Sequence, residues 1–188
     1  MVQQFFFGYG SLVNARTHAY PRPEPAVLRG WRRVWRPTAL RAEAFLSVRP
    51  SEGDAIRGLI APVPDGDWTA LDAREAGYDR HPVTADVDHA GAGGRDIRVY
   101  AVPDRAHRPD LAQHVLLSYI DVVVQGFLHQ YGREGVEHFF ATTDDWPALI
   151  RDDRAAPLYP RHQVLTDAER GIVDRALADL PVTVAAAP

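Results

Sequence analysis

The feature that most constrains this chain is an aromatic run near its N-terminus, followed at once by closely spaced glycines. Phe5–Phe7 are apolar at every position, which predicts a strand buried on both faces. The run stops at Gly8 and Gly10, where the missing Cβ lets the backbone turn sharply or approach a ligand. Such a turn can present backbone N–H groups to a carboxylate or phosphate, or it can simply close the strand.

The residues around this turn exclude several common sites. The G-x-G of Gly8 and Gly10 continues into Val13, so neither a dinucleotide-binding fingerprint nor a P-loop follows. Ser11 lacks the flanking glycines of a nucleophile elbow, and we therefore do not expect it to be a covalent nucleophile.

Composition narrows the chemistry further. A chain of 188 residues, 46% of them hydrophobic, suits one domain with a sizeable core. The absence of cysteine and lysine excludes thiolate and Schiff-base catalysis. The histidines are not spaced as paired ligands, so we expect no metal. No apolar run reaches the length of a membrane span, and we expect a soluble, cytoplasmic protein that does not bind membranes.

A net charge of −4 disfavours nucleic acid as a partner. The arginines between Arg29 and Arg36 form a local basic cluster with interleaved tryptophans. This cluster is either an anion or nucleic-acid groove or, as the acidic chain favours, the solvated face of a strand.

Hydrophobic patterning predicts strands in the first hundred residues and helices after them. The predicted strands, the last two joined by a glycine-rich turn at 91–94, are 27–35, 45–48, 55–61, 83–87 and 97–102. Helical spacing predicts helices over 109–131 and 134–141, and a capping box of Thr166 and Glu169 predicts a last one. The stretch 146–160 is irregular and either covers a site or ties down the last helix, and 182–188 is a frayed tail.

A second informative stretch runs from Asp67 to Gly77, which suit the two ends of a short helix. Glu75 lies seven residues after Trp68, so it shares the inward stripe, and it falls in the last turn of this helix. Burial and the helix dipole would both raise its carboxyl pKa toward the range of a general base. The alternative is a surface ion pair with Arg74 or Arg80.

Taken together, the two stretches resemble the gamma-glutamylcyclotransferase-like family. Tyr9–Leu12 matches the Y-G-S-L motif of that family, and Arg74-Glu75 matches its R-E motif. The resemblance implies an α+β fold, a small mixed β-barrel or sheet of about six strands with flanking helices. Residues 1–108 would form the β-rich core and 109–188 a helical extension packed on the same domain.

The resemblance also implies an activity. The enzyme would cyclise a γ-glutamyl group to 5-oxoproline and release an amine or amino acid, as in glutathione metabolism, without a cofactor. Tyr9, Gly10, Ser11 and Leu12 would hold the γ-glutamyl moiety mainly through backbone amides, Glu75 would be the general acid/base, and Tyr78 would lie near the site. Glutathione, γ-glutamyl amino acids and γ-glutamylamines all stay open as substrates, and so does the oligomeric state. The alternative is a non-catalytic module that binds a small carboxylate in the same pocket.

Overall fold

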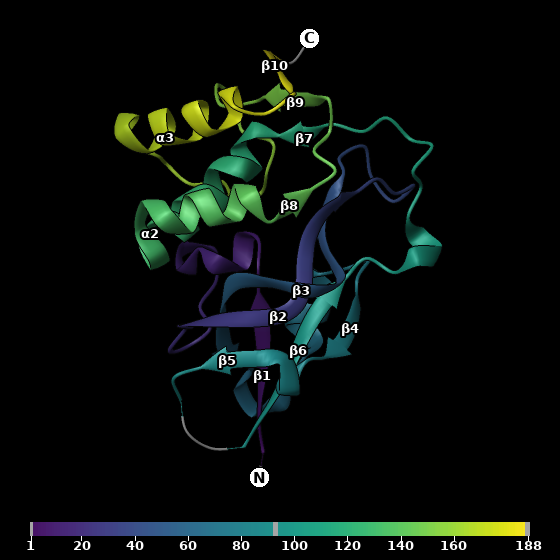
Figure 1. Cartoon of the computed structure of the whole chain (residues 1–188), viewed down its shortest axis with the longest axis vertical. Coiled ribbons are helices and arrows are strands. Elements are labelled where there is room, and N and C mark those ends of the chain that lie inside the picture. The colour runs from purple at the N-terminus through teal and green to yellow at the C-terminus, as the bar shows by residue number, and fades with distance from the viewer. Residues whose placement is uncertain (1, 92–93, 187–188) are drawn as a thin grey trace.

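The computed structural model describes residues 2–91 and 94–186, which form two sheets and three α-helices. The main sheet is curled, and its strand order is β4-β6-β1-β3-β2-β5, with β8 added beside β2 (Figure 1). Its strands are β1 (Gln3–Gly8), β2 (Glu24–Arg36), β3 (Phe45–Pro62), β4 (Asp79–Pro82), β5 (Val87–His89), β6 (Arg95–Ala101) and β8 (Thr143–Asp144). The expected α+β class is confirmed, with one strand more in this sheet than the six expected.

Strand β1 occupies the middle of the main sheet. It runs parallel to β6 and antiparallel to β3. Phe5, Phe6 and Phe7 are all buried, as the uninterrupted aromatic run predicts. The strand therefore delivers the following glycine turn to an interior position.

The long hairpin of β2 and β3 corrects one expectation. The segments 45–48 and 55–61, predicted as two strands, belong to the single strand β3. The pairing with β2 changes register between Arg29 and Trp31, which leaves residues 51–54 of β3 without partners there. The predicted turn is thus an irregularity inside a continuous strand.

The predicted strand 83–87 is wrong. Val83 and Val87 are buried as expected, but residues 84–86 form a 3-10 turn between β4 and β5. Strand β4 pairs with β6, whereas β5 pairs with β2. The alternating pattern spans two strands on different parts of the sheet, and the predicted hairpin turn 91–94 contains residues 92–93, which lie outside the described residues.

The helices are α1 (Thr69–Arg74), α2 (Leu117–Ala141) and α3 (Asp167–Ala178). The helix predicted to start at Pro109 starts at Leu117, because the residues just before it pair as strand β7 (Val115–Leu116). Gly132, with φ of 67° and ψ of −161°, interrupts α2 between the two helices predicted there. The capping box at the start of α3 is confirmed.

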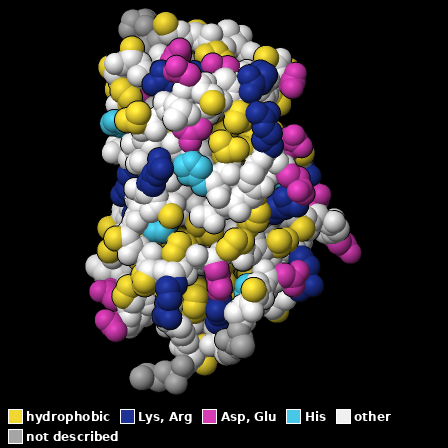
Figure 2. Space-filling view, turned by 90° about the vertical axis from the view of Figure 1, so that its left-hand side faces the viewer, with side chains coloured by type: hydrophobic (Ala, Val, Ile, Leu, Met, Phe, Trp, Pro, Cys, Tyr) yellow, Lys and Arg dark blue, Asp and Glu magenta, His cyan; other side chains and the backbone are white. Residues whose placement is uncertain are grey.

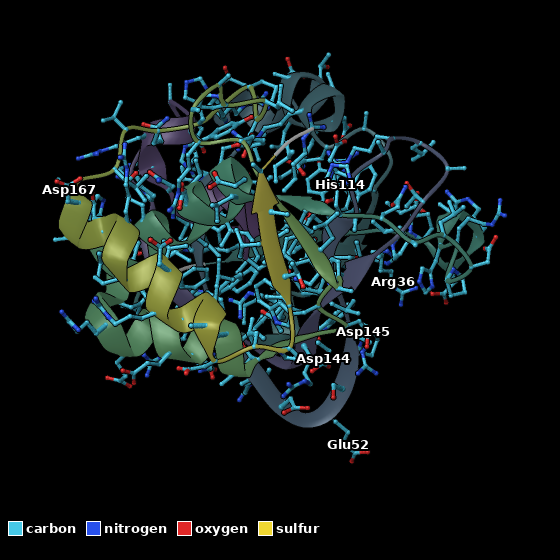
Figure 3. The ribbon with its side chains drawn as sticks, turned by 90° about the horizontal axis from the view of Figure 1, so that it is seen from above. Arg36, Glu52, His114, Asp144, Asp145 and Asp167 are labelled. Carbon is cyan, nitrogen blue, oxygen red and sulfur yellow. The ribbon has the colours of Figure 1, made fainter. Side chains whose placement is uncertain are left out.

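A second sheet covers the C-terminal part of the chain. Its strands are all parallel, in the order β10-β9-β7, with β9 (Leu149–Asp152) at the centre and β10 (Thr183–Ala186) at one edge. Residues 183–186 of the predicted frayed tail are therefore paired. Figure 3 shows this sheet beside α3, whose first residue Asp167 is labelled. Helix α2 lies between the main sheet and α3 (Figure 1).

Candidate active site

The glycine turn after β1 is tightly packed against the rest of the site. A 3-10 turn spans residues 11–13, preceded by Gly10 with φ of −125° and ψ of −128°. A Cβ on Gly10 would lie 2.8 Å from the hydroxyl of Tyr119 and 3.1 Å from Leu46. Since real Cβ atoms avoid contacts this short, only glycine lets α2 approach the turn so closely.

A buried arginine holds the turn from behind. Arg33 donates from Nε to the Tyr9 carbonyl at 2.8 Å and from a terminal nitrogen to Thr142 Oγ1 at 2.7 Å. It also donates to the Arg57 carbonyl and lies 4.8 Å from the ring centroid of Phe127. Burial lowers the pKa of Arg33 to about 9. Sequence reasoning missed this residue, because nothing in the local sequence distinguishes it from the arginines on either side.

The neighbours of Arg33 in the basic cluster are neutralised by carboxylates. The pairs are Arg29 with Asp88, Arg32 with Asp54 and Asp144, and Arg36 with Asp104. Arg36 and Asp144 are labelled in Figure 3. On the face drawn in Figure 2, arginines and acidic residues are interspersed rather than gathered by sign. These pairings leave Arg29, Arg32 and Arg36 without free charge for an anion or nucleic-acid groove, but the cluster is not a solvated face either, because only Arg29 is mostly exposed and the side chains of Arg32 and Arg36 are 22% and 13% exposed.

Helix α1 is shorter than predicted. Trp68 rather than Asp67 occupies its N-cap position, although the Asp67 side chain accepts a hydrogen bond from the Thr69 amide at 2.9 Å. The helix ends at Arg74, so Glu75 caps it instead of lying in its last turn. Gly77 follows with φ of +100° and turns the chain into β4.

The Glu75 side chain is largely removed from solvent, with 16% of it exposed. One carboxylate oxygen lies 3.2 Å from Nε of Arg74. Burial raises the pKa of Glu75 above its ordinary value, and the charges of Arg74, Arg161 and Arg41 oppose that shift. The ion pair with Arg74 exists, but it lies beneath the surface, and Arg80 pairs with Asp72 instead.

Arg74 also joins the two sequence motifs. Its terminal nitrogens donate to the Thr17 carbonyl at 3.0 Å, to Thr17 Oγ1 at 3.1 Å and to Ser11 Oγ at 3.3 Å. The guanidinium therefore fixes the end of α1, and with it Glu75, against the turn that follows β1.

These elements surround a cavity of about 450 Å³. A narrower pocket of about 30 Å³ continues it toward the backbone of Gly8–Leu12. The two spaces share the walls Ser11, Glu75, Tyr78 and Tyr119, so the carboxylate stands where they meet. The larger space is within the range of small-molecule sites.

The predicted binding residues contribute in different ways. Ser11 and Tyr78 line both spaces, and the Tyr78 hydroxyl donates to the Leu46 carbonyl at 2.9 Å. The Tyr9 side chain is buried and donates to the Tyr100 carbonyl at 2.7 Å. The Leu12 side chain is also buried. Of the four turn residues, only Ser11 therefore has a polar side chain that faces the cavity, and Tyr9, Gly10 and Leu12 have only backbone groups available there.

Four further wall residues carry no direct sequence signal, and they are Arg41, Tyr119, Tyr159 and Arg161. Tyr119 comes from α2 and packs edge-on against Tyr159, with ring centroids 5.0 Å apart. Buried Asp153 accepts hydrogen bonds from the amides of Ser118 and Leu158, both at 2.8 Å, and so fixes the loop after β9 to the start of α2. Only the prediction that the stretch 146–160 could cover a site pointed to this part of the cavity wall.

Solved structures share this fold. A gamma-glutamyl cyclotransferase superposes with a TM-score of 0.57 at 14% identity, covering 92% of this chain and 99% of that one. YkqA from Bacillus subtilis superposes with a TM-score of 0.60 at 18% identity, covering 77% of this chain and 55% of that one. The human protein loc79017 superposes with a TM-score of 0.55 at 16% identity, covering 90% of this chain and 97% of that one. None of the curated proteins matches the chain significantly in sequence.

The chain thus has the α+β fold of a gamma-glutamyl cyclotransferase. The family model of gamma-glutamyl cyclotransferases, AIG2-like, matches residues 6–118, and the chain belongs to this family. Tyr119, Tyr159 and Arg161 lie beyond the matched residues, so part of the cavity wall comes from outside the family match.

Residues 2–91 and 94–186 contain no group of three or more His, Asp or Glu side chains placed to hold a metal ion. In the same ranges no helix combines the length and apolar character needed to cross a bilayer.

Proposed function

We propose that this protein cyclises the γ-glutamyl group of a small amide to 5-oxoproline, with Glu75 as the general acid/base. One observation carries the proposal: a mostly buried carboxylate stands at the mouth of a narrow pocket formed by the glycine turn. Family membership and the fold shared with a gamma-glutamyl cyclotransferase support an enzyme of this kind.

The reaction needs no nucleophile from the protein. The α-nitrogen of the substrate attacks its own γ-carbonyl carbon, a new C–N bond closes the five-membered ring, and the original amide C–N bond breaks. The α-nitrogen loses two protons and the departing nitrogen gains two, so a group that carries protons between them is required. The α-ammonium first loses one proton to solvent, which frees the nitrogen to attack; Glu75 then takes the second proton as the ring closes and gives it to the departing nitrogen, and the released amine gains its last proton from solvent. Holding the substrate folded supplies the proximity for ring closure.

The turn would recognise the γ-glutamyl group. Its residues Gly8 to Leu12 line the narrow pocket. Their backbone amides would bind the carboxylate or stabilise the negative charge that develops on the γ-carbonyl oxygen. The hydrogen bonds from Arg33 and Arg74 keep the turn in place before substrate arrives. Because the turn is already in place, no free energy is needed to reorient its amides as the transition state forms.

The experiment is incubation of the purified protein with a panel of γ-glutamyl compounds, scored for 5-oxoproline. Turnover of at least one member is the expected result. Ligands that raise the melting temperature without being consumed would instead favour a binding module that keeps the pocket.

Gly10→Ala should lower kcat/KM by about 10–100-fold while the protein stays folded. The added methyl group would meet the Tyr119 hydroxyl at 2.8 Å, so either that wall or the turn must move. A misplacement of about 1 Å at a reacting centre can cost about 100-fold in rate, so a partial displacement gives an effect within this range. Gly94→Ala is the matched control, because a Cβ there meets no atom closer than 4.0 Å. Equal rates for the two variants would contradict the tight packing of the turn.

The rate should fall in acid through a pKa above the ordinary carboxyl value of about 4.3. Glu75 must be ionised to accept a proton, and burial raises its pKa, although Arg74, Arg161 and Arg41 oppose the shift. The hydroxyls of Tyr9, Tyr78 and Tyr119 face the same carboxylate, and their pKa values are raised, so they stay neutral through this range. The measurement is the pH profile of kcat/KM. A rate that holds constant down to pH values near 4 would show that another group is the base.

A further inference from the structure

The outer part of the cavity carries an excess of positive charge. Its charged wall residues are Arg41, Arg74, Arg161 and Glu75, three cations and one anion, so the net charge is +2. Arg74 is already paired with Glu75 and bonded to the turn. Two cations therefore remain for which the cavity provides no counter-charge.

Neither remaining arginine is neutralised elsewhere. Within the described residues, Arg41 and Arg161 form no ion pair with a carboxylate, unlike most arginines of the basic cluster. Arg41 is exposed and lies over the Phe45 ring, 3.6 Å from its centroid. Its guanidinium donates to the backbone carbonyls of Glu43 at 3.3 Å and of Ala44 at 3.5 Å, and to no carboxylate among the described residues. Arg161 is half-buried and follows Tyr159, the wall residue that packs on Tyr119. Unpaired guanidinium groups that line a cavity suit a carboxylate of the ligand.

The arrangement of the two spaces also indicates which part of a substrate Arg41 and Arg161 would contact. The narrow pocket at the turn is on one side of Glu75, while Arg41 and Arg161 line only the wider space on the other. If the γ-glutamyl end lies at the turn, the departing amine extends past Glu75 into the wider space. This step rests on the proposed function.

We infer that the substrate is a γ-glutamyl amino acid or peptide, whose departing amine carries a carboxylate bound by Arg161 and Arg41. The wider space is a leaving-group subsite, and it selects against neutral and cationic γ-glutamylamines. Arg161 lies beyond the residues that match the family model, so this selectivity depends on the chain's own C-terminal part.

The test uses two substrates that differ only in that carboxylate, γ-glutamylalanine and γ-glutamylethylamide. Charge-assisted hydrogen bonds of this kind predict a kcat/KM for γ-glutamylalanine about 10–100-fold higher. In Arg161→Gln this ratio should fall by about tenfold, and in the double variant with Arg41→Gln it should approach one. Arg175→Gln removes an exposed arginine of α3 outside this cavity, and it should leave the ratio unchanged.

Two outcomes would overturn the inference. One is wild-type turnover of the ethylamide at the rate of the alanine compound, and the other is a ratio that survives the double substitution. Calorimetric binding of both compounds to Glu75→Gln separates the subsite from the reaction. Selective binding without any 5-oxoproline from the wild type would retain the subsite and reject the proposed function. Turnover of both compounds without selective binding would retain the proposed function and reject the leaving-group subsite.

Discussion

Glu75→Gln should lower kcat/KM for 5-oxoproline formation by about 10²–10⁴-fold, the usual range for loss of a general acid/base. Glutamine keeps the size of the side chain and can still accept the hydrogen bond from Arg74, but it cannot carry a proton. The steady-state rate with a γ-glutamyl substrate is the measurement. A variant that keeps the wild-type rate would show that Glu75 is not the base.

Glu75→Gln should also stay folded, with no loss of stability at pH 7. Because burial raises the folded-state pKa of Glu75, its proton is held more tightly in the folded protein. The resulting stability is full below the unfolded-state pKa and is lost as pH rises through the folded-state pKa. Removing the charge should therefore leave the melting temperature at pH 7 equal to or above that of the wild type. Glu134→Gln is the control, since it alters a carboxylate that is also paired with an arginine but is 75% exposed.

Arg33→Ala should lower the free energy of unfolding by about 3 kcal/mol or more. The substitution leaves a cavity and removes the donors to the carbonyls of Tyr9 and Arg57 and to Thr142. Each buried polar group left without a partner costs about 1–3 kcal/mol, and the cavity adds to this loss. Because the Tyr9 carbonyl belongs to the turn, activity should fall together with stability. Urea unfolding followed by circular dichroism measures the first effect.

The adjacent residue provides the comparison. Arg32 lies in the same strand, but its side chain is 22% exposed and pairs with Asp54 and Asp144, which are also partly exposed. Arg32→Ala should therefore cost only about 1 kcal/mol. Equal losses for the two variants would refute the structural role assigned to Arg33.

Local patterns of the sequence predicted the elements that depend on neighbouring residues. The aromatic run gave β1, and Thr166 with Glu169 gave the start of α3, because both signals are complete within a few residues. The start of α2 was misplaced, since Val115 fits helical spacing but pairs with β9, a strand more than thirty residues away. For the same reason the alternating residues 83–87 did not reveal that β4, which ends just before them, and β5, which begins at Val87, pair with different strands.

The candidate site likewise contains residues that local sequence patterns predict and residues that they do not. The two motifs place Glu75 and the glycine turn on one cavity, and no knowledge of the later chain was needed for that. Arg33 could not be distinguished from the arginines on either side, because burial depends on how α2 covers the sheet. Arg161 could not be placed either, since its position depends on the loop that Asp153 fixes to α2.

The most direct test of the central claim is the identity of the products from γ-glutamylalanine. Internal ring closure predicts 5-oxoproline and alanine in equal amounts, with no free glutamate. Release of glutamate and alanine would mean that water, rather than the substrate's own α-nitrogen, attacks the γ-carbonyl, and it would contradict the account.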